Sequence, residues 1–76
     1  MLSLTASGDS ALQSNTTGTL NTAFGMDALV NNTAGGGNMA LGALADVSAE
    51  NLNNATAIGF LARVNTSNKI RLGTLL

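Results

Sequence analysis

The sequence is organised around a glycine that returns at a fixed interval. The interval is the same across the first four copies and shorter before the fifth: Gly8, Gly25, Gly42, Gly59 and Gly73. A similar short phrase precedes each copy, as in Thr22-Ala23-Phe24-Gly25 and Thr56-Ala57-Ile58-Gly59. A short, fixed period with no helical spacing inside it is typical of a coiled β-solenoid. We therefore expect an all-β fold of parallel strands with about four 17-residue coils.

The same period divides the 76 residues into one solenoid segment. The expected coils are 5–21, 22–38, 39–55 and 56–69, followed by a partial last coil, 70–76. Stacked β-strands rise by only about 4.8 Å per coil, so such a segment is short, and we expect it to be part of a longer fibre. The shorter step to Gly73 predicts a change in the character of the rod at that point.

Alignment of the coils at their glycines produces two columns before the glycine. Large apolar residues directly precede it: Phe24, Leu41, Ile58 and Leu72. Alanines stand one position earlier: Ala6, Ala23, Ala40 and Ala57. Successive side chains of a strand point to opposite faces, so the two columns lie on opposite faces of one strand per coil. Either column could face an assembly axis; we prefer the alanines, because small residues allow close approach.

A second short strand is expected after each glycine, which gives two strands per coil. Its paired positions are Ala28 and Val30, Ala45 and Val47, and Ala62 and Val64. The position between them is occupied by Leu12, Leu29, Asp46 and Arg63 in successive coils. A position that accepts leucine and both signs of charge is expected to be exposed to solvent or marginal. Segments rich in Asn and Gly, such as 31–37, supply the corners, because these residues adopt positive φ at low cost.

The composition favours self-association. Aromatic residues make up 3 % of the chain and charged residues 9 %, and the sequence contains no Cys and no His. Domains shorter than about 70–80 residues usually need disulfides, a metal or oligomerisation to be stable. Disulfides require Cys, and structural metal sites usually need Cys or His. We therefore expect the partner of this chain to be further copies of itself.

The same composition argues against several classes of function. A net charge of −1 offers no attraction to nucleic acid or to an anionic membrane, and the apolar runs are far shorter than the ~20 residues of a membrane span. No serine has an evident base, so we expect no enzyme and assign no catalytic, cofactor-binding or metal-binding residue. The three glycines at 35–37 lack the following Lys-Ser or Lys-Thr of a phosphate loop.

Charge is nonetheless distributed unevenly along the chain. All the acids precede residue 51 and all the bases follow residue 62: Asp9, Asp27, Asp46 and Glu50, then Arg63, Lys69 and Arg71. In a solenoid, position in the sequence corresponds to height along the rod. One end is therefore expected to be acidic and the other basic, which would suit docking to a neighbouring fibre segment.

Two stretches resemble repeats of trimeric surface fibres. Residues 21–29, Asn-Thr-Ala-Phe-Gly-Met-Asp-Ala-Leu, are similar to repeats of phage tail-fibre shafts, and residues 54–59 and 68–73 are similar to head repeats of bacterial trimeric autotransporter adhesins. The resemblance implies a left-handed β-roll, assembled as a homotrimer on a virion tail fibre or a bacterial cell surface. Arg71 departs from the pattern, because it stands in the alanine column.

These observations predict a structural segment, shaft or head, of an extracellular trimeric fibre used in adhesion or host attachment. A host-surface receptor is a further candidate partner, and its contact residues are unassigned. Two alternatives stay open: a subunit of a self-assembling extracellular filament, and an ice-binding β-solenoid. The second rests on a column formed by Thr5, Thr22 and Thr56, which Met39 interrupts. Because this column shares a face with the large apolar residues, we expect it to be interior rather than an ice-binding plane.

Overall fold

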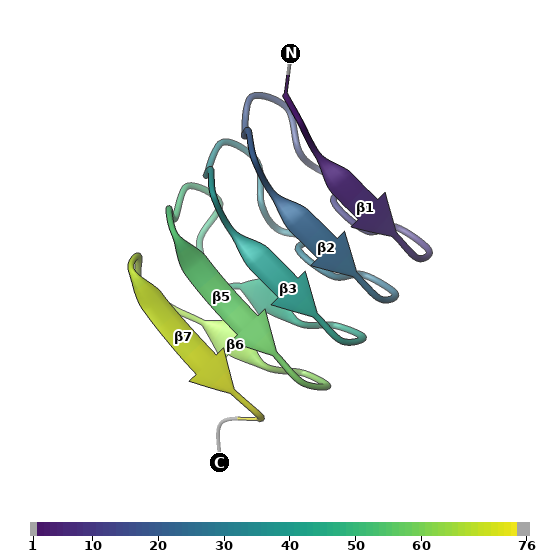
Figure 1. The fold of residues 1–76 in the computed structure, drawn as a ribbon, viewed down its shortest axis with the longest axis vertical. Helices are drawn as coiled ribbons and strands as arrows, with labels where there is room; N and C mark the ends of the chain where they lie inside the picture. The colour runs from purple at the N-terminus through teal and green to yellow at the C-terminus, as the bar shows by residue number, and fades with distance from the viewer. Residues whose placement is uncertain (1, 75–76) are drawn as a thin grey trace.

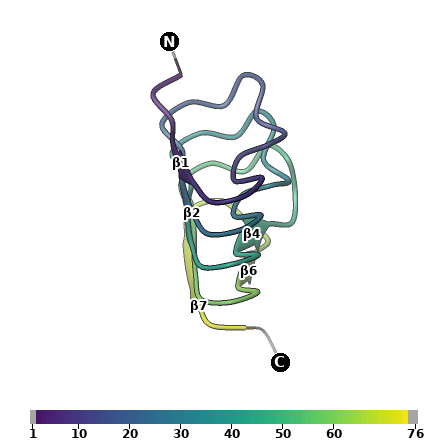
Figure 2. The same cartoon turned by 90° about the vertical axis from the view of Figure 1, so that its right-hand side faces the viewer.

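In the computed structural model, which describes residues 2–74, the chain winds into a β-solenoid (Figure 1). One side of the coil is a five-stranded sheet of β1 (Thr5–Ser7), β2 (Thr22–Phe24), β3 (Met39–Leu41), β5 (Ala55–Ile58) and β7 (Lys69–Leu72), in that order. The opposite side carries a two-stranded sheet of β4 (Asp46–Val47) and β6 (Arg63–Val64) (Figure 2). Within residues 2–74 there is no helix.

The strand register follows the period of the sequence. β1 pairs with β2, β2 with β3 and β3 with β5 in parallel, each time offset by one full glycine interval, as in Ala23 opposite Ala40. β7 pairs with β5 at the shorter offset of the last glycine step, with Arg71 opposite Ala57. The prediction of an all-β, parallel solenoid of about four coils is confirmed.

The recurring glycine marks a corner where successive coils touch through their backbones. Gly25 has a φ of +128°, a conformation that side chains disfavour. A Cβ built on Gly25 would lie 2.7 Å from the carbonyl carbon of Gly42 in the next coil. The corresponding Cβ on Gly8 would lie 2.6 Å from the carbonyl carbon of Gly25. Glycine is therefore required both by the turn and by the spacing between coils.

Two further corners also have positive φ, and leucine occurs at both. The corner after the glycine is formed by Ser10, Asp27, Leu44 and Leu61. The corner before the main strand is formed by Ser3, Leu20, Gly37, Asn54 and Asn68. The amides at these corners donate to carbonyls of the preceding coil, as Leu44 does to Met26 at 2.8 Å and Leu20 to Leu2 at 2.9 Å. These hydrogen bonds hold a conformation that costs a non-glycine residue roughly 1–2 kcal/mol.

The expectation of two strands per coil holds only for the third and fourth coils, where β4 and β6 form. In the first two coils the chain turns at Leu12 and Leu29, with φ of +56° and +53°. Both leucines are buried at these turns. In the third and fourth coils a β-strand replaces the turn, and its valine, Val47 or Val64, is buried on this side of the coil. The first two coils therefore fill this part of the interior with a leucine at a left-handed turn, and the later coils fill it with a valine in a strand.

The prediction that this column is exposed is also wrong for three of its four members. Leu12, Leu29 and Asp46 are buried, and only Arg63 is exposed. The leucines are turned inward by their positive φ, and the Asp46 carboxylate is held by backbone amides. The change from leucine to a charged residue at this position thus reflects the change from a left-handed turn in the first two coils to a β-strand in the next two, rather than contact with solvent.

A ladder of asparagine side chains links the first three coils. Asn21 Nδ2 donates to the carbonyl of Gly35 at 2.8 Å, and Asn38 Nδ2 donates to that of Leu52 at 2.7 Å. The two Oδ1 atoms accept the backbone amides of Asn38 and Ala55, at 2.9 and 2.8 Å. Each of these buried amides thus bonds to the following coil.

A second asparagine column completes the ladder. Asn32 Nδ2 donates to Asn15 Oδ1 at 3.0 Å, and Asn32 Oδ1 accepts from Asn38 Nδ2 at 2.9 Å. One repeat beyond Asn32 and Asn38 stand Ala49 and Ala55, so these two buried columns end in coil 39–55. An exposed pair, in which Asn54 Nδ2 donates to Asn68 Oδ1 at 2.9 Å, joins that coil to the fourth. The rod therefore changes character within coil 39–55 as well as at the shorter glycine step.

Substitution of Gly25 by alanine is expected to destabilise the solenoid by more than about 2 kcal/mol, because a methyl group would collide with backbone atoms of Gly42. Gly73 is a matched comparison: its φ is also positive, but a Cβ there meets no described atom within 4 Å. Gly73→Ala should cost clearly less than Gly25→Ala in urea unfolding. Equal losses would show that the turn, and not coil contact, selects glycine.

Substitution of Asn38 by alanine removes an acceptor for the buried Ala55 amide and a donor for the Leu52 carbonyl. We expect a loss of about 2–4 kcal/mol in the free energy of unfolding, because buried polar groups are left without partners. Asn51→Ala, at an exposed asparagine, should change stability by less than about 0.5 kcal/mol. A small effect of Asn38→Ala in the same unfolding assay would contradict a structural role for the ladder.

Candidate functional site

The outer face of the five-stranded sheet is the main candidate site. On each strand the residue before the glycine and the residue two positions earlier point away from the coil interior. The outward positions are Thr5, Ser7, Thr22, Phe24, Met39, Leu41, Thr56, Ile58, Ile70 and Leu72. All ten are uncharged, and six of them are large apolar residues.

This face is apolar and open to solvent. The exposed fractions are 50 % for Phe24, 47 % for Leu41, 67 % for Ile70 and 74 % for Leu72. Ile58 is half-buried and lies next to Leu41 in the register. Single exposed apolar side chains are ordinary, but a continuous apolar patch marks a contact surface. The sheet therefore presents a row of large apolar side chains that the single chain leaves in contact with solvent.

The alanine column lies inside the coil. Ala23, Ala40 and Ala57 are buried and pack with Leu29 and Val47 in one core cluster. The preference for alanine toward an assembly axis is therefore wrong. Alternation along the strand separates two faces, and the narrow coil accepts the small side chains inside and leaves the large ones outside.

The threonine column lies on the same exposed face. Thr5 is exposed and Thr22 and Thr56 are half-buried, on the side of the sheet that carries Phe24 and Leu41. The expectation that this face is interior is wrong for the single chain. Met39 interrupts the threonines, and large apolar residues alternate with them, so the face is an apolar surface rather than a plane of hydroxyl groups.

Asp46 is a buried carboxylate at the boundary between the two kinds of coil. Both of its oxygens accept the backbone amide of Asn31 from the second coil, at 3.2 and 3.3 Å. Oδ1 also accepts the amide of Val47, at 2.8 Å. In the next coil, backbone carbonyls accept the corresponding bonds, as when Ser48 donates to Val64 at 2.9 Å. The carboxylate thus supplies an acceptor where the backbones of the second and third coils diverge.

Burial raises the pKa of the Asp46 carboxyl above its ordinary value. The amides of Val47 and Asn31 and the positive charge of Arg63, its register partner, act in the opposite direction but are outweighed. Asp27 adds a smaller contribution that raises the pKa further. The proton equilibrium of Asp46 is therefore coupled to folding.

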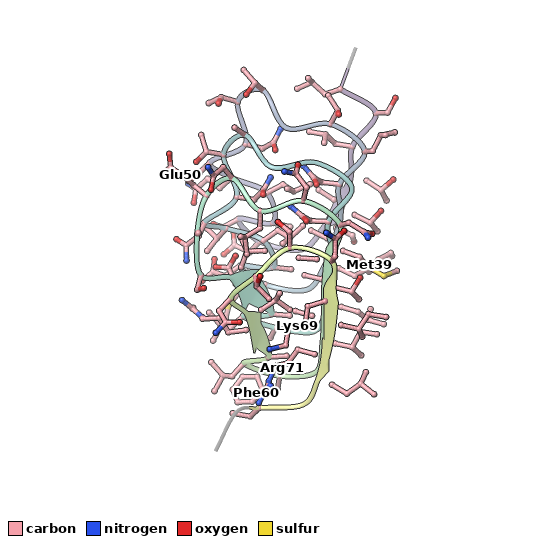
Figure 3. All side chains as sticks on the ribbon, turned by 90° about the vertical axis from the view of Figure 1, so that its left-hand side faces the viewer. Met39, Glu50, Phe60, Lys69 and Arg71 are labelled. Atoms are coloured by element: carbon pink, nitrogen blue, oxygen red, sulfur yellow. The ribbon has the colours of Figure 1, made fainter. Side chains whose placement is uncertain are left out.

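Lys69 and Arg71 of β7 lie at the C-terminal end of the stack (Figure 3). The third basic residue, Arg63, belongs to β6 in the coil before it. Lys69 and Arg71 occupy inward positions and are half-buried, opposite Ala55 and Ala57. The acids occur earlier in the chain, from Asp9 to Glu50. The expected separation of charge along the rod is therefore present.

Residues 2–74 contain no cluster of acids, cysteines or histidines that could hold a metal ion, and they enclose no pocket. In the same part of the chain, no helix has the length and apolarity needed to cross a bilayer.

In comparisons with protein-family models, with curated proteins and with solved structures, none matches this chain.

The pH dependence of stability is predicted from Asp46. Because its pKa is higher in the folded chain than in the unfolded chain, the folded state binds more protons between the two values. The free energy of unfolding should therefore fall as the pH rises from about 4 through the raised pKa, by about 1.4 kcal/mol for each unit of difference. Urea unfolding at a series of pH values measures this slope.

Asp46→Asn should abolish that slope, because an amide keeps an acceptor oxygen for Asn31 and Val47 without carrying a charge. Asn51→Ala, at an exposed residue that does not titrate, is the control and should leave the slope unchanged. A slope that persists in Asp46→Asn would mean that another group is responsible.

Proposed function

We propose that this chain is a structural segment, shaft or head, of a homotrimeric fibre on a cell or virion surface that serves adhesion or host attachment. The observation that carries the proposal is the apolar outer face of the sheet, on which the side chains of Phe24, Met39 and Leu41 are exposed to solvent. The resemblance of residues 21–29 and 54–73 to trimeric fibre repeats supplies the number of chains and the left-handed coil.

The composition of the face supports burial against identical faces. Protein interfaces are depleted of charged residues at their centre, and the ten outward positions of the main sheet are all uncharged. Three chains with this face toward a common axis would bury Phe24, Leu41 and Ile58 of each chain among those of the others. Burial of apolar surface contributes about 25 cal/mol per Å², so an assembly of this kind would add the core that one thin coil lacks.

The proposed role is mechanical. Coils are joined along the rod by the parallel ladder, the asparagine amides and the corner hydrogen bonds. The described chain extends 36 Å along its longest axis and 14 Å along its shortest. A stack of such coils gives length and stiffness, while outward turns such as 31–37 and 65–68 are available for contact with a receptor.

The proposal is tested by placing a charge on the outer face. The wild-type melting temperature should rise with protein concentration, because folding and association are coupled. Leu41→Lys should lower it by at least about 5 °C and remove the concentration dependence, because a buried ammonium opposes assembly. Differential scanning calorimetry over a range of concentrations measures both effects.

Phe60→Lys is the control, because Phe60 is an exposed apolar residue that lies beyond the glycine corner rather than on the sheet. This variant should keep the concentration dependence of the wild type. A wild-type melting temperature that does not vary with concentration would contradict the proposal, and so would equal effects of the two lysines.

A further inference from the structure

The last strand differs from the others in what it directs into the coil. In β7 the inward positions are Lys69 and Arg71, which pair in register with the buried alanines Ala55 and Ala57. In the earlier coils the inward position of Arg71 is occupied by Ala23, Ala40 and Ala57, and that of Lys69 by Asn21, Asn38 and Ala55. Two long charged side chains therefore end two inward columns that carry no charge in the preceding coils.

Both charged side chains lie at the C-terminal end of the stack (Figure 3). They are half-buried, and the Arg71 Nε is shielded from solvent without a hydrogen-bond partner among the described residues. Long basic side chains can cover apolar surface with their methylene groups while the charged ends reach water. The stems of Lys69 and Arg71 can thus close the interior below Ala55 and Ala57.

β7 is also a strand that needs protection. It is an edge strand of the main sheet, and at four residues it is as long as β5, its neighbour. Its outward residues, Ile70 and Leu72, are exposed and favour β-structure. A Cβ on Gly73 would meet no described atom within 4 Å, whereas a Cβ on Gly25 or Gly42 would collide with the backbone of the following coil. An unprotected edge of this kind is a template for pairing with another strand.

We propose that Lys69 and Arg71 form an end cap that prevents β7 from pairing with the β1 edge of a second copy of this chain. A coil added below β7 would enclose both charges between apolar layers and remove them from water, which strongly disfavours pairing. β1 has no such device, because its inward residue is the exposed Ala6. The two edge strands of the described sheet therefore differ in their inward residues, which are charged in β7 and uncharged in β1.

The cap is tested by removing both inward charges with Lys69→Ala and Arg71→Ala together. The double variant should form end-to-end rods whose mass grows with concentration, because β7 can then pair with β1 of the next copy. Wild type should keep a fixed mass over about a tenfold range of concentration above its assembly threshold. Sedimentation velocity measures the masses, negative-stain electron microscopy shows the rods, and circular dichroism checks folding.

Two further variants identify the junction and the mechanism. Adding Ala6→Lys to the double alanine variant places an inward charge on the β1 edge and should return the protein to fixed mass. Replacing both basic residues by glutamate should also keep the mass fixed, because inward charge of either sign resists burial. Arg63→Ala, at an exposed base outside β7, should behave as wild type.

Three results would overturn the proposal. The first is a folded double alanine variant that stays at the wild-type mass. The second is a wild type that itself joins end to end at low salt and is dispersed by the glutamate pair, since the basic end would then be a docking site for the acidic end. The third is loss of folding in both double variants, which would assign the two residues to the core. These three results do not depend on the outcome of Leu41→Lys, which tests the outer face of the main sheet and not its edge.

Discussion

The close contact of backbones at the glycine corner is the constraint on which the rest of the structure depends. Because Gly25 has no Cβ, its backbone can lie against that of Gly42 while the neighbouring strands keep the spacing of a hydrogen-bonded sheet. This contact fixes the register at one glycine interval. Once the register is fixed, identical residues stack: Ala23 lies opposite Ala40, and Asn32 bonds to Asn15 of the preceding coil.

The coil is too thin to bury its own large apolar side chains. The interior is filled by alanines, with Leu12, Leu29 and two valines on the opposite side. Phe24, Leu41 and the other large residues of the main strands are left on the outer face. In a chain of this size, the apolar surface that makes one coil incomplete is the surface that additional copies could bury. The thin coil and the proposed assembly therefore have the same physical origin.

Much of the architecture could be predicted from the sequence, because the glycine period reports directly on coil length and register. The face of each main strand that points into the coil could not be predicted. Alternation along Thr22-Ala23-Phe24 places residues on two opposite faces but does not indicate which face is enclosed. The left-handed corners at Leu12, Leu29 and Leu44 were also beyond prediction, because hydrogen bonds from neighbouring coils stabilise a conformation that leucine disfavours by itself.

The asparagine ladder was within reach of the sequence. Asn15 and Asn32, like Asn21 and Asn38, are separated by the same interval as the glycines, but asparagine is so common in turns that the spacing carried no weight. In contrast, nothing in the sequence indicates that Asp46 is buried. Its burial depends on the mismatch between a leucine corner in one coil and a β-strand in the next, and that mismatch is visible only in three dimensions.

The molar mass of the wild-type chain in solution, measured by light scattering, tests most directly whether the outer face is an interface between copies. Three times the chain mass of 7.6 kDa is predicted. A folded species with the mass of one chain would contradict the proposed assembly, because the apolar face would then be stable in water. Very large species of growing mass would instead indicate a filament.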